Sequence, residues 1–508
     1  MTAGRTRTHV AARGFAWTSF GYGAQAASQL LLLVVLAREL SPADFGVVQA
    51  ALVVIGLGRL LTESIVGPAL VQRPTISDRL VRTGGTIAIL CGLLTAGVIF
   101  VSAPLLAALF DSERFVPVVR VLVISFIIQA IGVVSESLML RELQFRRLAH
   151  AAVWSFVIGY AAVGVVLGIA GAGVWALVGA NIAQLGVFTA LLLVFRPVSL
   201  RPAFDRGSAR VLMHYGGGFT LGRFFNYAAL QGDYAVVGST LSSAALGIYG
   251  RAYQLLATPA MLLGQVIDRV LFPMQAEIQH DRTRLANQYR RAVSLVAVVM
   301  LPLSAFVFVL APQIVAITLG DKWDGVVTPL RLLSISLLAR ASYKLSDTLS
   351  RALGLVYSRA ARQLVYAVLV VVGALIGQRW GVSGVAACVA VAVIANFVLM
   401  AHLILGATGL TWTAFAAAHG RGAVLAALVT ALVTPVAVVA DHASLSPVVT
   451  LAAACALGAL LLPVLRRHRS ALLGPDMAWL VARLRAKNVP AEPPAEQPAE
   501  QPAVEVPT

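Results

Sequence analysis

The sequence contains two copies of one short motif, and their separation decides the fold. The first copy is Leu40-Ser41-Pro42-Ala43-Asp44-Phe45-Gly46-Val47, and the second is Leu241-Ser242-Ser243-Ala244-Ala245-Leu246-Gly247-Ile248. Each copy joins one long apolar stretch to the next. We therefore expect a chain made of two halves that repeat one structural unit.

Pairs of identical or similar residues continue this register with a slow drift. The pairs are Pro104 with Pro312, Arg120 with Arg331, Ser125 with Ser336, Ser135 with Ser346, Glu136 with Asp347, and Gly173 with Gly384. One such pair can arise by chance, but a series in constant order indicates an internal repeat of about 200 residues.

The composition places these halves in a membrane. Of the 508 residues 59% are hydrophobic and 12% are charged, and the mean hydropathy is +0.85, which excludes a string of soluble domains. A bilayer core needs about 20 apolar residues per helix, and about fourteen stretches reach that length. These spans are 15–37, 46–66, 83–106, 117–140, 151–171, 174–195, 214–237, 244–274, 290–311, 329–350, 363–379, 382–404, 420–440 and 446–464.

The repeat covers six spans, an even number, so both halves cross the membrane in the same direction. The sequence therefore predicts an all-α polytopic protein with two six-helix lobes, related by a pseudo-two-fold axis along the membrane normal, plus two extra helices. The first span is read as a retained helix rather than a cleaved signal peptide because its counterpart, 214–237, is internal.

The basic residues supply an orientation. About two-thirds of the 39 Lys and Arg residues fall in alternate loops, as expected for cytosolic loops and cytosolic termini. The predicted segments are a cytosolic amino-terminal segment 1–14, an N-lobe 15–195, a cytosolic linker 196–213, a C-lobe 214–404, the extra spans 420–464, a cytosolic interfacial helix 465–487 and a disordered tail 488–508.

No catalytic chemistry is predicted. Cys91, Cys388 and Cys455 all fall in apolar stretches, and no Walker A, HExxH or GxSxG pattern occurs. We expect no catalytic residue, no metal site, no enzyme activity and no nucleic-acid partner.

Charges inside the spans are costly, so they normally face a bundle interior or a wet cavity. The basic ones outnumber the acidic ones, which favours an anionic substrate. The basic residues are Arg59, Arg120, Arg223, Arg251, Arg269, Arg331, Arg340 and Lys344, and the acidic ones are Glu63, Glu136, Asp233, Asp268 and Asp347.

The predicted substrate-binding cations are Arg59, Arg223, Arg340, Lys344, Arg251 and Arg269. Arg251 and Arg269 lie near span ends, where snorkelling to the interface is an alternative. Arg340 and Lys344 are four residues apart with like charge, so an anion or a partner acid is expected opposite them.

The predicted gating or coupling acids are Glu63, Glu136, Asp233 and Asp347. The alternatives are an ion pair between Glu63 and Arg59, and solvation of the other three carboxylates at helix ends.

Several segments carry a family resemblance, and they run in register from about residue 13 to 415. They are 36–46, 69–73, Gly171-Ala172-Gly173-Val174-Trp175, Ala245-Leu246-Gly247-Ile248-Tyr249-Gly250-Arg251-Ala252-Tyr253, Arg269-Val270-Leu271-Phe272-Pro273 and Leu319-Gly320-Asp321-Lys322-Trp323. The chain resembles the Wzx-type oligosaccharide flippases, in the colanic-acid exporter-like branch of the multidrug/oligosaccharidyl-lipid/polysaccharide exporter superfamily.

The resemblance implies a V-shaped pair of lobes around a cationic cavity in the bacterial inner membrane. It implies alternating-access transport of oligosaccharide units linked to undecaprenyl pyrophosphate, for surface polysaccharides such as lipopolysaccharide or exopolysaccharide. It also implies contact with membrane lipids and with polysaccharide polymerase machinery, and coupling to a Na⁺ or H⁺ gradient without a bound cofactor.

Two alternatives remain open. A cation-coupled multidrug exporter of the same superfamily usually carries a carboxylate in its first helix, but 15–37 contains neither Asp nor Glu. A membrane polysaccharide polymerase or ligase generally has a large outer loop with catalytic residues, but the longest outer break here is short.

Overall fold

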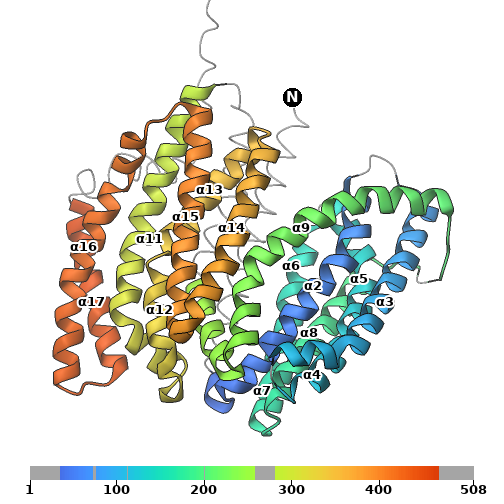
Figure 1. Ribbon diagram of the computed structural model, residues 1–508, viewed down its shortest axis with the longest axis horizontal. Coiled ribbons are helices and arrows are strands. Elements are labelled where there is room, and N and C mark those ends of the chain that lie inside the picture. Colours follow the sequence, from blue (N-terminus) through green and yellow to red (C-terminus); the bar gives the residue numbers. More distant parts are fainter. Residues whose placement is uncertain are drawn as a thin grey trace, which may run out of the picture.

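Every regular element that the computed structural model describes is helical (Figure 1), and the described residues are 35–72, 76–110, 112–142, 144–199, 201–257 and 281–467. The elements are α2 (Pro42–Gln72), α3 (Asp78–Phe110), α4 (Phe115–Leu122), α5 (Ile124–Arg141), α6 (Phe145–Trp154), η1 (Ser155–Ala162), α7 (Val163–Ile169), α8 (Val174–Phe195), α9 (Arg206–Thr240), α11 (Arg282–Thr318), η2 (Asp321–Val326), α12 (Val327–Ser334), α13 (Leu337–Ala352), α14 (Val356–Gly377), η3 (Gln378–Trp380), α15 (Gly381–Thr408), α16 (Trp412–His442) and α17 (Pro447–Arg467). Residues 243–257 form a further helix.

Within these ranges, 8 helical segments are long and apolar enough to cross a membrane. The predicted class, an all-α multi-pass membrane protein, is confirmed. Every predicted span that lies wholly within the described residues coincides with helix.

Some predictions fall outside the described part of the chain. The span 15–37 overlaps it only at 35–37, and the span 244–274 only as far as residue 257. The count of fourteen spans therefore stays a prediction. The interfacial helix 465–487 and the tail 488–508 also lie outside, apart from the end of α17 at Arg467.

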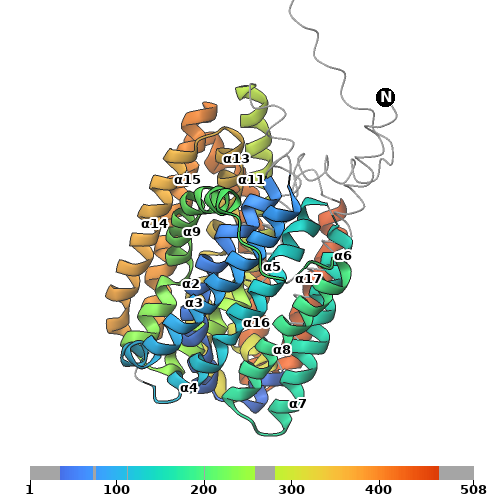
Figure 2. The ribbon, with the colours of Figure 1, turned by 90° about the vertical axis from the view of Figure 1, so that its right-hand side faces the viewer.

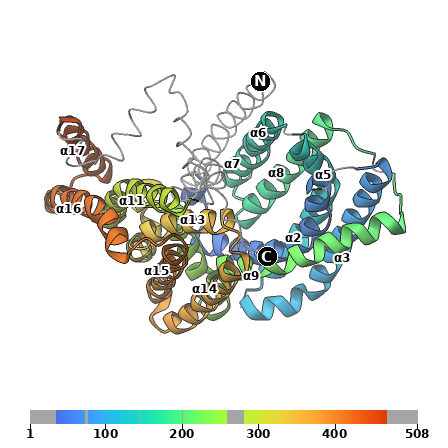
Figure 3. The same ribbon diagram turned by 90° about the horizontal axis from the view of Figure 1, so that it is seen from above.

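The helices form two groups (Figures 1 and 3). The N-lobe contains α2 to α8, and Figure 2 shows α6, α7 and α8 side by side at one edge of it. The C-lobe contains α11 to α17. The lobes converge at one end and diverge toward the other, as Figure 1 shows. We call the converging end the outer end, following the orientation expected from the charge pattern of the loops.

The two lobes repeat their local irregularities as well as their helices. The fourth helix of the N-lobe is broken at Val123, between α4 and α5, and its counterpart is broken at 335–336, between α12 and α13. The preceding helices, α3 and α11, each contain a proline near the outer end, at Pro104 and Pro312. Irregularities at matching positions support the internal repeat read from the sequence.

Side-chain contacts repeat too. The guanidinium of Arg120 lies 4.9 Å from the ring centre of Phe100, and its counterpart Arg331 donates a hydrogen bond of 3.1 Å to the carbonyl oxygen of Phe308. Arginine therefore joins the fourth helix to the third in each lobe.

One predicted repeat pair needs correction. Gly173, with φ 56°, immediately precedes α8, and the glycine in a similar conformation at the start of the corresponding helix is Gly381, the first residue of α15, with φ 67°. Gly384 lies inside α15 instead. Both lobes therefore have a glycine with positive φ at the start of this helix, a conformation that glycine tolerates. In the C-lobe this glycine lies three residues before the position that the sequence register indicated.

Helix α9 joins the lobes. Its first half lies across α2 and α3 of the N-lobe, and its second half packs against α14 of the C-lobe (Figure 1). The preceding linker is tied to α3, because the backbone N–H groups of Ala203 and Asp205 donate to the hydroxyls of Thr86 and Thr83, at 2.9 and 3.2 Å. Asp205 in turn caps α9 by accepting from the backbone N–H of Ser208 at 2.7 Å.

The hydrogen bonds from Ser208 lower the pKa of the Asp205 carboxyl below its ordinary value. The cap therefore stays ionised at neutral pH, next to the positive end of the helix dipole.

The last two helices, α16 and α17, pack against α11 at the edge of the C-lobe (Figure 1). Gly422 of α16 crosses close to the backbone of α11, since a methyl group added there would lie 2.4 Å from the carbonyl oxygen of Ala297. Two residues earlier, a methyl group on Gly420 would meet nothing within 4 Å.

These two glycines give a matched pair of variants. Gly420→Ala should raise the melting temperature slightly or leave it unchanged, because alanine is favoured over glycine inside a helix by about 0.5–1 kcal/mol. Gly422→Ala should lower it, because the added methyl group overlaps a backbone atom of α11. Thermal unfolding of the purified protein in detergent measures both, and equal melting temperatures would contradict the α11–α16 packing.

Candidate functional site

The lobes meet at the outer end through the two copies of the repeated motif. A methyl group added to Gly46 would lie 1.6 Å from the carbonyl oxygen of Ser243, and one added to Gly247 would lie 1.9 Å from the carbonyl oxygen of Pro42. In each case the seventh residue of one copy touches the third residue of the other. Such reciprocal contact is the mark of a two-fold relation, and it requires glycine at both positions.

A loop of the C-lobe reinforces this contact. Trp323 is fully buried, and its indole N–H donates to the carbonyl oxygen of Ala37 at 2.9 Å. The ammonium of Lys322 donates to the carbonyl oxygen of Arg38 at 2.6 Å. The Trp323 ring also meets Phe45 edge to face, with 5.4 Å between ring centres. We refer to residues 37–47, 241–248 and 319–323 together as the outer junction.

Arg251 lies next to the outer junction. Its guanidinium stands 4.4 Å from the ring centre of Phe45, which belongs to the other lobe, and donates a hydrogen bond to the side-chain oxygen of Gln254. Its Nε atom is buried with no hydrogen-bond partner. The sequence left open a snorkelling role for Arg251; in the structure its side chain packs across the lobe interface.

A second group of polar side chains is buried inside the C-lobe. Asp233 of α9 is 2% exposed and accepts a hydrogen bond of 2.6 Å from the hydroxyl of Tyr249 and one of 2.9 Å from the backbone N–H of Tyr234. The rings of Tyr234, Tyr249 and Tyr253 pack against one another, with centres 5.3 to 6.2 Å apart. We call these residues, with Arg340, the Asp233 cluster.

Arg340 of α13 closes the cluster. Its guanidinium lies 4.4 Å from the ring centre of Tyr253 and donates to the hydroxyl of the same residue. Two more of its donor atoms, Nε and Nη2, are buried without a partner. A buried hydrogen-bond donor without an acceptor destabilises the folded state by about 1–3 kcal/mol, so both N–H groups are suited to bind an anionic group.

Asp347 has a different environment. It is 5% exposed, and its carboxylate pairs with Arg359 of α14 at 2.5 Å and with Arg351 of its own helix at 3.4 Å. The pair with Arg359 joins α13 to α14 near the end of the lobe opposite the outer junction. In place of the helix-end solvation considered for Asp347, the structure shows a buried carboxylate paired with two partly exposed arginines.

The other predicted residues are placed less completely. Arg59 lies exposed on α2, Lys344 lies on α13 with its ammonium 5.2 Å from the ring centre of Tyr343, and Glu136 is partly buried on α5. Arg223 and Glu63 lie on α9 and α2, but their side chains are outside the described part of the structure. Arg269 and Asp268 lie outside the described residues altogether.

The site residues that sequence reasoning missed are Tyr234, Tyr249 and Tyr253, together with the glycines of the outer junction. The spacing of Tyr249 and Tyr253, four residues apart in a helix, placed both rings on one face, and Asp233 precedes Tyr234 directly. That spacing was available as a signal. No local signal paired this face with Arg340, which is 87 residues beyond Tyr253.

Comparisons with known proteins agree with this architecture. The sequence model of a family described as "Polysaccharide biosynthesis protein" matches residues 35–328. The lipopolysaccharide biosynthesis protein WzxC of Escherichia coli is 26% identical over 320 residues, which are 61% of this chain and 64% of WzxC. The succinoglycan biosynthesis transport protein ExoT of Rhizobium meliloti is 25% identical over 331 residues, 64% of this chain and 65% of ExoT.

Each of these matches thus spans less than two thirds of the relative's length. Among solved structures, the lipid II flippase MurJ in an inward closed conformation superimposes with a TM-score of 0.70 at 12% identity, over 87% of this chain and 98% of MurJ. A multidrug resistance MATE family transporter of the MOP superfamily, in an inward-facing conformation, gives 0.61 at 15% identity, over 79% of this chain and 95% of that one. At these identities the likeness concerns the fold.

The glycine contact makes a direct prediction. In a background without the three native cysteines, Val47→Cys should react slowly with a thiol reagent, because Val47 is 4% exposed beside Gly46. Adding Gly247→Ala should speed the reaction at least about tenfold, because the new methyl group overlaps Pro42 and forces the outer junction open.

Gly250→Ala is the matched control, three residues further along the same helix. Its methyl group would lie 3.5 Å from the ring of Tyr234, an ordinary contact, so labelling should not change. Equal labelling rates for the Gly247 and Gly250 variants would show that the glycine contact does not hold the junction closed.

Proposed function

Because the chain belongs to the polysaccharide biosynthesis protein family, whose sequence model matches residues 35–328, we propose that it moves lipid-linked oligosaccharides across the bacterial inner membrane by alternating access. The carrier lipid is undecaprenyl pyrophosphate in this proposal. Both termini lie in the cytosol, and the transported units pass to polysaccharide polymerase machinery on the outer side. The basic residues concentrated in alternate loops support the orientation.

Transport rather than synthesis is supported by the proteins that this chain resembles. ExoT is named a transport protein, and the solved structures with the same fold are a flippase and a drug transporter. Polysaccharide export is preferred to drug export because WzxC and ExoT are both named for polysaccharide biosynthesis. The net positive charge within the predicted spans supports an anionic cargo as well.

The single observation that carries the mechanism is the reciprocal closure at the outer junction. The lobes touch there through backbone atoms, a few side-chain hydrogen bonds and the packing of Trp323 against Phe45, and they diverge at the other end (Figure 1). Each hydrogen bond is worth about 1 kcal/mol net, and opening the junction also exposes the apolar side chains packed there. A ligand that binds the open state better can supply the free energy that opening requires.

The cargo is negatively charged at its pyrophosphate, and this charge needs compensation inside the low-dielectric membrane. Arg59, Arg223, Lys344 and Arg269 are proposed to line the path. Arg251 and Arg340 are also proposed to line the path. Both carry buried guanidinium N–H groups that have no acceptor, which supports this role for them.

Coupling to a Na⁺ or H⁺ gradient is proposed to act through Asp233. A carboxylate that is 2% exposed and shares a cluster with Arg340 can change its charge only by changing that arginine's surroundings. Cation binding at Asp233 would therefore change how firmly the Arg340 guanidinium is held in the Asp233 cluster. Glu63, Glu136 and Asp347 remain proposed gating residues, and the ion pair of Asp347 with Arg359 suits it to holding α13 and α14 together.

The double substitution Arg340→Ala with Lys344→Ala tests the cation assignment. Translocation of a fluorescent lipid-linked oligosaccharide in proteoliposomes should fall at least about tenfold, because two positive charges are lost from the spans. Arg379→Ala, an exposed arginine in an outer loop, is the control and should transport normally. A folded double variant that transports at the wild-type rate would contradict the assignment of Arg340 and Lys344 to cargo binding.

Asp233→Asn tests the coupling. The asparagine oxygen can still accept from the backbone N–H of Tyr234, and its amide N–H can donate to the Tyr249 hydroxyl in place of the bond that the carboxylate accepts, so the fold and the melting temperature should persist. Transport should lose its response to an imposed Na⁺ or H⁺ gradient, each applied separately. Asp347→Asn is the contrasting variant, because it weakens two ion pairs and should lower the melting temperature. An unchanged gradient response in Asp233→Asn would exclude this residue from coupling.

A further inference from the structure

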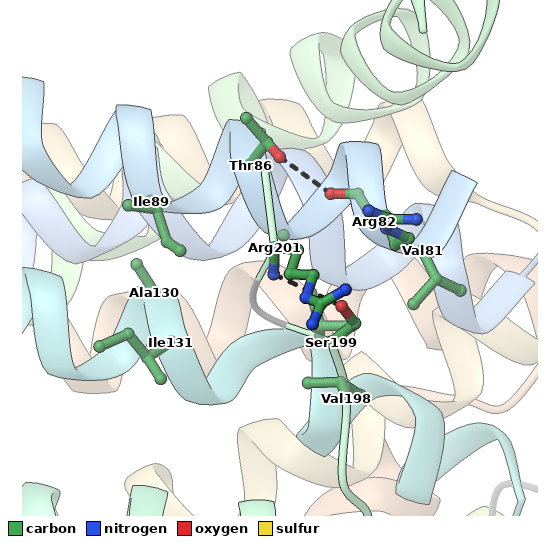
Figure 4. Close-up of a pocket in the computed structure, with 11 residues that line it drawn as sticks. Val81, Arg82, Thr86, Ile89, Ala130, Ile131, Val198, Ser199 and Arg201 are labelled. Atoms are coloured by element: carbon green, nitrogen blue, oxygen red, sulfur yellow. Dashed lines mark hydrogen bonds between the residues drawn. The ribbon is translucent and has the colours of Figure 1, made fainter. Parts of the chain in front are cut away.

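A small pocket lies far from the outer junction, where the N-lobe meets the linker that leads into α9 (Figure 4). Three segments form it: the beginning of α3, the middle of α5, and the linker residues 198, 199 and 201. Its lining residues are Val81, Arg82, Gly85, Thr86, Ile89, Ala130, Ile131, Val134, Val198, Ser199 and Arg201. The proposed transport function assigns no role to this pocket.

The pocket has a fixed frame. The linker is held on α3 by the hydrogen bonds that Thr86 and Thr83 accept from it. The Thr86 hydroxyl also donates to the carbonyl oxygen of Arg82 at 3.1 Å, and the backbone N–H of Arg201 donates to the hydroxyl of Ser199 at 3.4 Å, as Figure 4 shows. Arg82 and Arg201, which are 119 residues apart in sequence, are therefore held at one site.

The charge of the pocket is entirely positive. No acidic residue lines it, and within the described residues neither Arg82 nor Arg201 forms an ion pair. Arg196, on the same face of the N-lobe, does pair with an acid, Glu142, at 2.9 Å. The positive-inside rule explains why arginines occur on this face, but not why two from distant segments flank one pocket without a counter-charge.

The opposite side of the pocket is apolar. Figure 4 shows Ile89, Ala130 and Ile131 across from the two arginines. On the pocket-lining face of α3, one turn beyond Ile89, Leu93 is 48% exposed and continues the apolar surface. The enclosed volume is about 10 Å³, which is room for one oxygen atom of water size. A ligand would insert one oxygen beside Ser199, and its bulk would lie between the exposed arginine side chains.

We propose that Arg82 and Arg201 bind the phosphate of an anionic phospholipid from the cytosolic leaflet, with an acyl chain along the apolar side of α3. Phosphate suits this pair because guanidinium groups bind its oxygens with two parallel hydrogen bonds. Basic pockets between helices on the cytosolic side are a known location for anionic headgroups. Bound lipid would fasten the linker to the N-lobe beside the start of α9, the helix that enters the C-lobe.

Binding is tested on the purified full-length chain by titration with phosphatidylglycerol, using the shift in melting temperature against phosphatidylcholine of the same chain length. The wild type should be stabilised by phosphatidylglycerol alone, since a ligand that binds the folded state raises the unfolding temperature. Arg82→Gln with Arg201→Gln should weaken the apparent affinity at least about tenfold, because two charge-assisted contacts are lost.

Arg206→Gln with Arg210→Gln is the matched control. It removes the same charge from exposed positions on α9 that do not line the pocket, and it should keep the wild-type affinity. An equal loss in both double variants would mean general surface attraction and would overturn the site.

Two further probes distinguish sources of phosphate. Inorganic phosphate, at the same concentration, should not reproduce the shift; if it does, the site is not a lipid site. Undecaprenyl phosphate should shift the melting temperature no more than phosphatidylglycerol does, and a clear preference for it would replace the phospholipid assignment. Neither result depends on transport, so failure of the proposed function would leave this test intact.

Discussion

The structure depends on one contact between bare backbones. Gly46 and Gly247 let the two copies of a repeated loop approach until each glycine touches a carbonyl oxygen of the other copy, at Ser243 and Pro42. A side chain at either position would hold the lobes apart. The glycine contact itself contains little apolar surface, but the buried Trp323 packs beside it against Phe45, so opening the outer junction separates apolar side chains as well as backbone.

Inside the C-lobe the constraint is electrostatic, because charged side chains must be stabilised in a low-dielectric interior. Tyrosine does this work: Tyr249 supplies a hydrogen bond to Asp233, and Tyr253 supplies both a ring face and an oxygen to Arg340. The compensation is incomplete, since two donor atoms of Arg340 lack a partner. An unsatisfied donor in an otherwise satisfied cluster is where a change of state or a ligand is expected to act.

The sequence was sufficient for the large-scale architecture. The spacing of apolar stretches predicted the helices, because membrane thickness sets the length of each span. Pairs such as Pro104 with Pro312 predicted the repeat, because each lobe keeps the same irregularity at the same place. Partners were harder to predict. Nothing near Asp347 indicated that Arg359 would pair with it across two helices, and the close approach at Gly247 depends on how the lobes pack. Charge type could be read from the sequence, but three-dimensional neighbours could not.

Alternating access is the central claim, and distances at the two ends of the molecule test it most directly. Spin labels at Glu113 and Asp324 would report the outer end, and labels at Arg147 and Tyr357 the opposite end; all four side chains are exposed. Double electron–electron resonance should show a short outer distance and a long inner distance without substrate. Adding lipid-linked oligosaccharide should lengthen the first and shorten the second. Distances that stay fixed, or that lengthen together, would contradict the account.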